Sequence, residues 1–201
     1  KKRETAKARG LNDRRERLEK ALEQLPKIRE LKKSETDKRD ARVSETDPEA
    51  RIMKQSGGGF APSYNVQLSV DAAHDIIVNV DVSQSGTDHG ELTGSVRKVE
   101  ERTGSKPAQV VADTGYTNHA NILSMSDAKI DFFGSFPDKS GLMETAEAKE
   151  IYRTRSKTAE FPNAWIKEKF GLRQFRTRGK EKTNQEALWA SITYNIQQWI
   201  R

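Results

Sequence analysis

One carboxylate stands where the sequence predicts the end of a buried strand. Asp113 follows the apolar run Val110–Ala112 and precedes Thr114-Gly115-Tyr116. In α/β folds ligands bind at the carboxyl ends of strands, so an acid that emerges there could hold a ligand. An aspartate in this position can also cap the helix that follows. The residues alone leave both interpretations open.

A second acid shares a predicted helix, residues 158–169, with a lysine. Glu160 and Lys167 are seven residues apart, close to two helical turns, so both project from one face. That face would suit an acid that contacts a metal ion and a lysine that contacts a phosphate. The alternative is a solvated charged face, which is the commoner role of such a pair on an arbitrary helix.

A basic run follows this helix and holds Arg173, Arg176 and Arg178 around Phe175. Arginine side chains bind phosphate oxygens, and an aromatic ring can pack or stack on a base. The run therefore predicts phosphate contacts first and base contacts by Phe175 second.

The elements that would position these side chains alternate between strand and helix. Two strand candidates, residues 64–70 and 76–82, are joined by a link short enough for a hairpin. They are followed by a helix at 87–102 that ends at Gly104, a strand at 110–112, a helix at 118–125, a strand at 130–133 and a helix at 184–200. This alternation predicts a layered α/β sheet. The last helix is expected to pack on the domain through Leu188, Ile192, Asn195, Ile196 and Trp199.

The N-terminal part has a different texture. Leucines recur at helical spacing up to Leu25, which predicts a charged helix with one narrow apolar stripe that Pro26 interrupts. Residues 1–43 are therefore predicted to be a charged basic helical arm or hairpin, apart from residues 44–201. Direct contact of this arm with DNA is the sharper interpretation, and a solvent-exposed helix is the plainer one. Further on, Gln55–Gly59 predicts a flexible turn.

Charge is unevenly distributed over the 201 residues, whose formal net charge is +6. Residues 1–45 carry sixteen Lys and Arg against ten Asp and Glu, residues 46–148 carry eight against fifteen, and residues 149–182 carry eleven against four. An acidic middle between basic ends suits a carboxylate site that holds cations while its flanks bind phosphate.

The composition also excludes several classes of protein. The chain has no cysteine, so disulfides and thiolate metal sites are excluded. Its three histidines are too scattered to suggest a zinc cluster. No apolar run is long enough for a membrane span, and no signal peptide is found, so we expect a cytoplasmic protein.

Five stretches, in this order, resemble the DDE transposases of bacterial insertion sequences. They are Thr46–Lys54, Tyr64–Gln67 with Val70-Asp71, Ala112–Tyr116, Ala159–Pro162 and Thr177–Lys182. Together they span about residues 43–200. The resemblance implies a ribonuclease H-like catalytic domain, and hence an α/β mixed sheet flanked by helices.

The resemblance also implies a metal site. In this family three carboxylates hold two divalent ions, Mg²⁺ or Mn²⁺; Asp113 matches the second acid and Glu160 the third. Lys167 matches the lysine of a Tyr-Arg-Glu-Lys signature, and Tyr152 and Arg155 resemble its first two members. Arg155 stands one residue further from Glu160 than the signature expects.

The first acid of the family has no clear counterpart. It belongs on a first strand, before the stretch that resembles residues 46–54, and the residues before Ser44 form a charged helix instead. Asp71 is the best of several poor substitutes, and the others are Asp75, Asp81 and Asp88. We therefore expect a C-terminal fragment with an incomplete sheet, which is inactive in isolation because two carboxylates hold a metal pair poorly.

The expected function is that of a transposase, which cleaves and transfers DNA strands with the help of metal ions. Its partners would be double-stranded DNA, namely element ends and target, and the resemblance allows a homodimer in the DNA complex. We expect a bacterial, nucleoid-associated protein. The alternatives are an inactive DNA-binding or regulatory transposase fragment, and a nuclease with the ribonuclease H-like fold.

Overall fold

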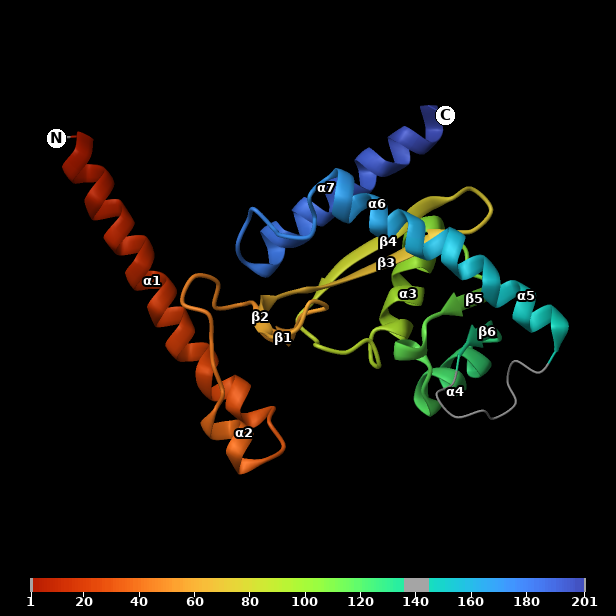
Figure 1. Ribbon diagram of the computed structural model, residues 1–201, viewed down its shortest axis with the longest axis horizontal. Helices are drawn as coiled ribbons and strands as arrows, with labels where there is room; N and C mark the ends of the chain where they lie inside the picture. Colours follow the sequence, from red (N-terminus) through yellow and green to blue (C-terminus); the bar gives the residue numbers. More distant parts are fainter. Residues whose placement is uncertain (1, 136–144, 201) are drawn as a thin grey trace. The chain divides into compact units, whose positions relative to one another are not determined.

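The computed structural model describes residues 2–135 and 145–200 and has an α/β fold. Its helices and strands are shown in Figure 1. The described residues form two compact units. The first unit contains residues 2–65, 84–86 and 176–183, and the second contains residues 66–83, 87–135, 145–175 and 184–200.

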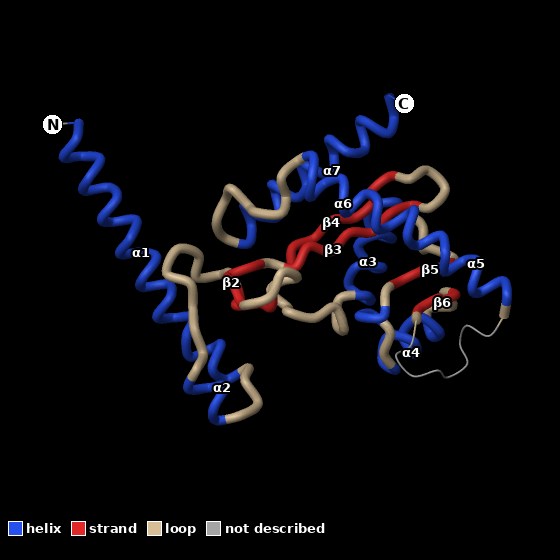
Figure 2. The backbone as a smooth tube through the Cα atoms, in the orientation of Figure 1, coloured by secondary structure: helices blue, strands red, loops and turns tan. Residues whose placement is uncertain are grey.

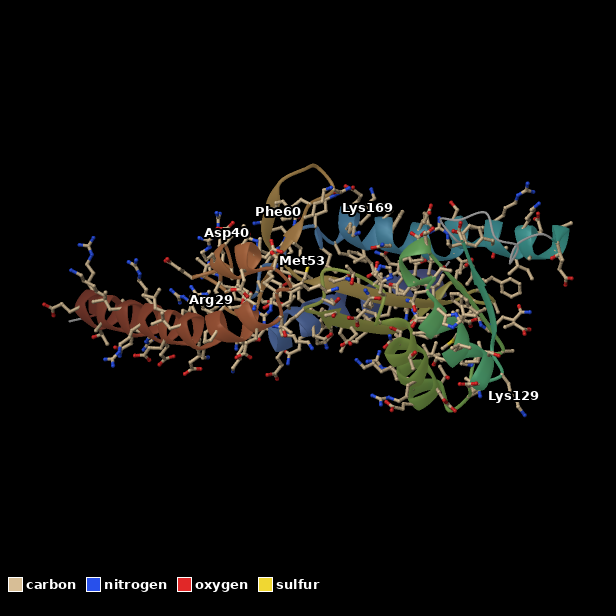
Figure 3. The ribbon with its side chains drawn as sticks, turned by 90° about the horizontal axis from the view of Figure 1, so that it is seen from below. Arg29, Asp40, Met53, Phe60, Lys129 and Lys169 are labelled. Atoms are coloured by element: carbon tan, nitrogen blue, oxygen red, sulfur yellow. The ribbon has the colours of Figure 1, made fainter. Side chains whose placement is uncertain are left out.

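The first unit begins with two helices, α1 (Lys2–Glu30) and α2 (Glu35–Arg39). Charged side chains project along α1, whose last turn ends just after the labelled Arg29 (Figure 3). The prediction that Pro26 interrupts this helix is wrong, because α1 continues through it. Proline removes one backbone donor, but Ile28 in the turn that follows is buried, and its burial favours one more turn.

A hairpin completes the strands of the first unit. β1 (Arg51–Lys54) pairs antiparallel with β2 (Phe60–Ser63), and Met53 and Phe60 mark the two strands in Figure 3. The predicted turn at Gln55–Gly59 is confirmed: Gln55 N–H donates to the Gly59 carbonyl, and Gly58 and Gly59 have positive φ angles. The two short strands beside this turn were not predicted.

The second unit contains two separate pairs of strands (Figure 2). β3 (Asn65–Asp71), whose first residue belongs to the first unit, pairs with β4 (Ile76–Ser83). β5 (Gln109–Ala112) pairs with β6 (Asp131–Gly134) in parallel, with Ala112 opposite Gly134. Among the described residues, no strand joins the two pairs into one sheet.

Helices connect these strands much as predicted. α3 (Leu92–Thr103) begins later than expected and ends at Gly104, which has a φ of 73°. A short 3₁₀ turn, η1 (Thr114–Tyr116), and α4 (His119–Asp127) link β5 to β6. The predicted β–α–β alternation is therefore confirmed in this part of the chain.

A small apolar core fixes the end of β5. Its buried members are Leu92 of α3, Ala112 of β5, Met125 of α4 and Ile130 before β6. Ala112 is the last residue of β5, so this core holds the backbone that directly precedes Asp113.

Residues 146–169 form one long helical run. It comprises α5 (Ala146–Arg155), a π-helical turn η2 (Ser156–Glu160) and α6 (Phe161–Lys169), and Figure 1 shows the three in line. The predicted helix at 158–169 is thus only the second half of a longer one. α5 contacts both β5 and β6.

The last helix, α7 (Lys180–Ile200), packs through a different face from the predicted one. Its buried residues in the second unit are Ala187, Ala190, Ser191 and Tyr194, whereas Trp199 is 87% exposed and Leu188, Ile192 and Ile196 are also exposed. Both sets recur at helical spacing, and the set that contains small residues lets α7 approach β4 closely. Asn195 was predicted correctly, because its amide bonds both the N–H and the carbonyl of Ile77, at 2.8 Å each.

Asn79 on β4 gives a stability prediction. It is 1% exposed, and neither polar atom of its amide has a hydrogen-bond partner among the residues that the structure describes. Burying an amide in this way costs free energy, so we expect Asn79→Leu, which has the same branching and number of side-chain heavy atoms, to raise the free energy of unfolding by about 1–2 kcal/mol. Urea denaturation would measure this change. Asn118→Leu is the control with the opposite expected sign: it should lower the free energy of unfolding, because the Asn118 side chain caps α4. A less stable Asn79→Leu protein would contradict the prediction.

Candidate active site

Asp113 directly follows Ala112, the core residue with which β5 ends. One carboxylate oxygen, Oδ1, accepts a hydrogen bond from the Thr114 N–H at 2.7 Å and so caps the turn η1. The other oxygen, Oδ2, lies 3.3 Å from Nη1 of Arg155. The capping interpretation is therefore confirmed, while the other oxygen faces a guanidinium and its role in binding a ligand stays a prediction.

Arg155 joins the two acids singled out in the sequence. Its Nη2 lies 2.7 Å from Oε1 of Glu160, while its Nη1 reaches Asp113. The arginine side chain is 21% exposed, against 59% for Asp113 and 53% for Glu160. The second carboxylate oxygen of Glu160 accepts from the Ser156 hydroxyl at 3.0 Å. Residues far apart in the sequence thus place two carboxylates on opposite ends of one guanidinium.

The π-helical turn explains how Arg155 reaches Glu160 despite the additional residue between them. Ser156–Glu160 is π-helical. In a π-helix each N–H bonds to the carbonyl five residues earlier, so residues five apart lie on the same side. In an ordinary α-helix that relation holds for residues three or four apart. The wider turn therefore absorbs one residue and keeps Arg155 and Glu160 together.

Tyr152 supports the arginine from the preceding turn. The guanidinium carbon of Arg155 lies 5.3 Å from the centre of the Tyr152 ring, a cation–π contact between residues three apart on α5. The first three members of the expected signature are therefore in one place: the tyrosine under the arginine, and the arginine against the glutamate.

The predicted phosphate-binding residues outside this cluster belong to both units. Lys167 is exposed on α6, two turns after Glu160 and on the same side of the helix. The exposed Arg173 donates from Nε to Oε1 of Glu168 at 2.9 Å, and this bond lowers the pKa of the Glu168 carboxyl. Arg176 and Arg178 are exposed residues of the first unit.

A polar network that was not predicted holds the turn after Asp113. Tyr116 donates from its hydroxyl to Oε1 of Gln67 on β3, and Gln67 donates from Nε2 to Oδ1 of Asp88 at 2.8 Å. Gln67 is 3% exposed, and burial is the main reason why the pKa of Tyr116 lies above its usual value. Gln67 stands at a polar position of an alternating strand, together with Asn65 and Ser69, so the sequence carried no signal that its side chain is buried.

Three of the four substitutes considered for the first acid, Asp71, Asp81 and Asp88, have partners of their own. Asp88 lies against the Gly115 backbone, where a Cβ would come 3.2 Å from its Oδ2. Asp71 bonds His74 at 2.5 Å, which is the main reason for the low pKa of Asp71, and Asp81 is paired with Lys98. No group of three or more His, Cys, Asp or Glu side chains within residues 2–135 and 145–200 is placed to hold a metal ion.

A comparison with protein families identifies the C-terminal part of the chain. Residues 137–200, about a third of the chain, match the family described as "Transposase DDE domain". The match includes Tyr152, Arg155, Glu160 and Lys167, and Asp113 lies before it. No curated protein and no solved structure gave a match. The predicted resemblance to DDE transposases is confirmed, and with it a function in DNA transposition.

The same match supports two coarser expectations, that the family uses a divalent metal ion and that it binds DNA. None of the described helices is both long enough and apolar enough to cross a membrane.

Proposed function

Because this chain is a relative of the DDE transposases, we propose that Asp113 and Glu160 are two of the acids that hold its divalent metal ions. The observation that carries this proposal is the shared contact with Arg155, at 3.3 Å from Asp113 and 2.7 Å from Glu160. Two carboxylates that face a single guanidinium also face a single point at which another cation can bind.

The donor set fits a hard cation. Mg²⁺ and Mn²⁺ bind carboxylate oxygens, and Mg²⁺ needs only one or two carboxylates per ion because it keeps several waters. When bound, such ions activate an attacking water or 3′-hydroxyl and stabilise the leaving oxygen. Lys167, two turns beyond Glu160, would bind and orient the scissile phosphate, with Tyr152 and Arg155 beside it.

In this proposal the third acid comes from a strand that lies between β3 and β5. Neither strand has a second strand neighbour among the described residues, and unpaired sheet edges accept a further strand. The hydrogen bond from Tyr116, just after β5, to Gln67 on β3 ties the two edges together by their side chains. A strand between them would complete a mixed sheet of the ribonuclease H-like kind.

The DNA itself would be double-stranded, comprising the ends of the element and the target. Residues 1–43 would form the basic arm and residues 44–201 the catalytic part, with Arg173, Arg176 and Arg178 as phosphate contacts. A homodimer would assemble on the DNA. The basic ends found in the sequence support this arrangement, because cationic side chains release counterions when they bind phosphates.

The metal assignment predicts that each acid contributes to Mn²⁺ binding. We expect the chain to bind Mn²⁺ weakly, and Asp113→Asn or Glu160→Gln to lower the affinity about tenfold or more, since each loses a charged ligand. Electron paramagnetic resonance of free Mn²⁺ measures this. Asp127→Asn is a control, because that acid lies elsewhere, at the end of α4. If both variants bind Mn²⁺ like the unchanged chain, the assignment is wrong.

A second candidate function is DNA binding without catalysis. It is favoured by the placement of only two acids together in the described residues. We expect duplex DNA binding that weakens steeply with salt, and no nicking of supercoiled plasmid with Mg²⁺ or Mn²⁺. Nicking that Asp113→Ala abolishes would contradict this expectation. Plasmids that carry donor ends would then separate hydrolysis from strand transfer.

A further inference from the structure

Arg155 occupies the place between Asp113 and Glu160 that a metal ion would need. Its two terminal nitrogens each approach a carboxylate oxygen, and four-fifths of its side chain is shielded from solvent. Both carboxylates are more than half exposed, so solvent screens each ion pair and another partner can displace the guanidinium. The guanidinium already satisfies the two charges that would attract a divalent ion.

A divalent ion and this guanidinium cannot both bind the pair favourably. They carry charges of the same sign and would contact the same two carboxylates, so each disfavours the other. An ion that binds Asp113 and Glu160 must displace Arg155 or accept its repulsion. Arg155 therefore competes with metal instead of helping to hold it.

DNA offers the displaced arginine another partner. Guanidinium groups bind phosphate in the same two-pronged manner as carboxylate. Two further exposed cations on the same helical run, Lys157 and Lys167, would favour the approach of a phosphate. The π-helical turn starts directly after Arg155, and such turns are frequent at functional sites.

We propose that Arg155 blocks the Asp113–Glu160 pair until a DNA phosphate draws it away, so that DNA binding increases the affinity for metal. This inference rests on the proposed metal role of the two acids. The coupling is reciprocal, because a ligand that raises the affinity for a second ligand is itself bound more tightly in its presence. Metal would then load where DNA is already bound, which limits hydrolysis at the wrong place.

The test measures Mn²⁺ binding to the full chain by electron paramagnetic resonance, with and without a short DNA duplex. For the unchanged chain we expect the duplex to raise the Mn²⁺ affinity about tenfold, within the usual range of such couplings. Arg155→Gln should bind Mn²⁺ about tenfold more tightly without DNA, and the duplex should add little. Arg153→Gln is the matched control, since Arg153 is exposed on the same helix and pairs with Glu150.

Each outcome decides between defined alternatives. An Arg155→Gln protein with unchanged or lower Mn²⁺ affinity, or an unchanged chain whose affinity does not respond to the duplex, overturns the inference. Arg155→Met removes the charge but keeps a long side chain, so it should also gain affinity; it serves as the second variant if Arg155→Gln does not fold. Adding Asp113→Asn to Arg155→Gln must abolish the gain. If the gain persists, the proposed metal site itself is wrong.

Discussion

Replacement of Asp47 by alanine is expected to lower the free energy of unfolding of the first unit by about 2–4 kcal/mol. Its carboxylate accepts hydrogen bonds from the Tyr64 hydroxyl and from the Gly179 N–H, all at 3.0 Å. Both bonds would be lost, and a partly buried donor such as the Gly179 N–H costs more when it is unsatisfied than its bond contributes.

Asp47 acts together with a second acid at the start of α7. Glu49 accepts from the Lys180 N–H at 2.7 Å, so two carboxylates contact the first N–H groups of that helix. Helix N-termini carry unsatisfied donors and a partial positive charge, which negative side chains stabilise. These contacts of Asp47 and Glu49 join two of the stretches that resemble transposases, Thr46–Lys54 and Thr177–Lys182, and give both a structural role.

Chemical denaturation followed by circular dichroism measures the effect of Asp47→Ala. Asp13→Ala is the control, since Asp13 is exposed on α1, and its stability should stay within about 0.5 kcal/mol of the unchanged chain. If Asp47→Ala lowers the free energy of unfolding by less than about 1 kcal/mol, the contacts of Asp47 do not stabilise the start of α7.

The second large effect is expected for Gly134→Ala, at the end of β6. A Cβ there would collide with the Thr117 hydroxyl and come 2.8 Å from a ring carbon of Phe132. Thr117 is buried and donates to the Asp113 carbonyl, so it cannot move without disturbing the turn that carries Asp113. Overpacking of this kind costs about 1–3 kcal/mol, and we expect the upper end.

The matched control for this substitution is Gly94→Ala. Gly94 lies inside α3 and a Cβ there meets nothing within 4 Å, so alanine should stabilise the helix by about 0.5–1 kcal/mol. The same chemical change is thus expected to have opposite signs at two positions. Thermal unfolding of both variants measures the difference. Equal effects would contradict the packing described around Asp113.

The sequence predicted the elements whose pattern is local. β5, α4 and β6 follow from apolar runs and helical spacing, and the exit of Asp113 from β5 follows from them. The buried face of α7 could not be predicted, because Leu188 with Ile192 and Ala187 with Ser191 have the same spacing. Only the strand that α7 packs on, β4, distinguishes the two.

The candidate site was predicted by residue type but not by contact. The sequence singled out Asp113, Glu160 and Arg155, and it showed that Arg155 was one residue out of place. The contact between Arg155 and Glu160 depends on the width of a single helical turn, Ser156–Glu160, and the contact between Arg155 and Asp113 depends on the packing of α5 on β5, neither of which has a local sequence signal. The network of Gln67, Asp88 and Tyr116 was missed because it joins three separate elements.

The most direct test of the account is a crystal structure of the chain grown with Mn²⁺ and a DNA duplex, with anomalous scattering used to locate the ions. We expect an anomalous peak in contact with the carboxylates of Asp113 and Glu160, and the guanidinium of Arg155 turned away toward a phosphate. Mn²⁺ bound elsewhere, with Arg155 still bridging the two acids, would contradict both the metal site and the role of the arginine.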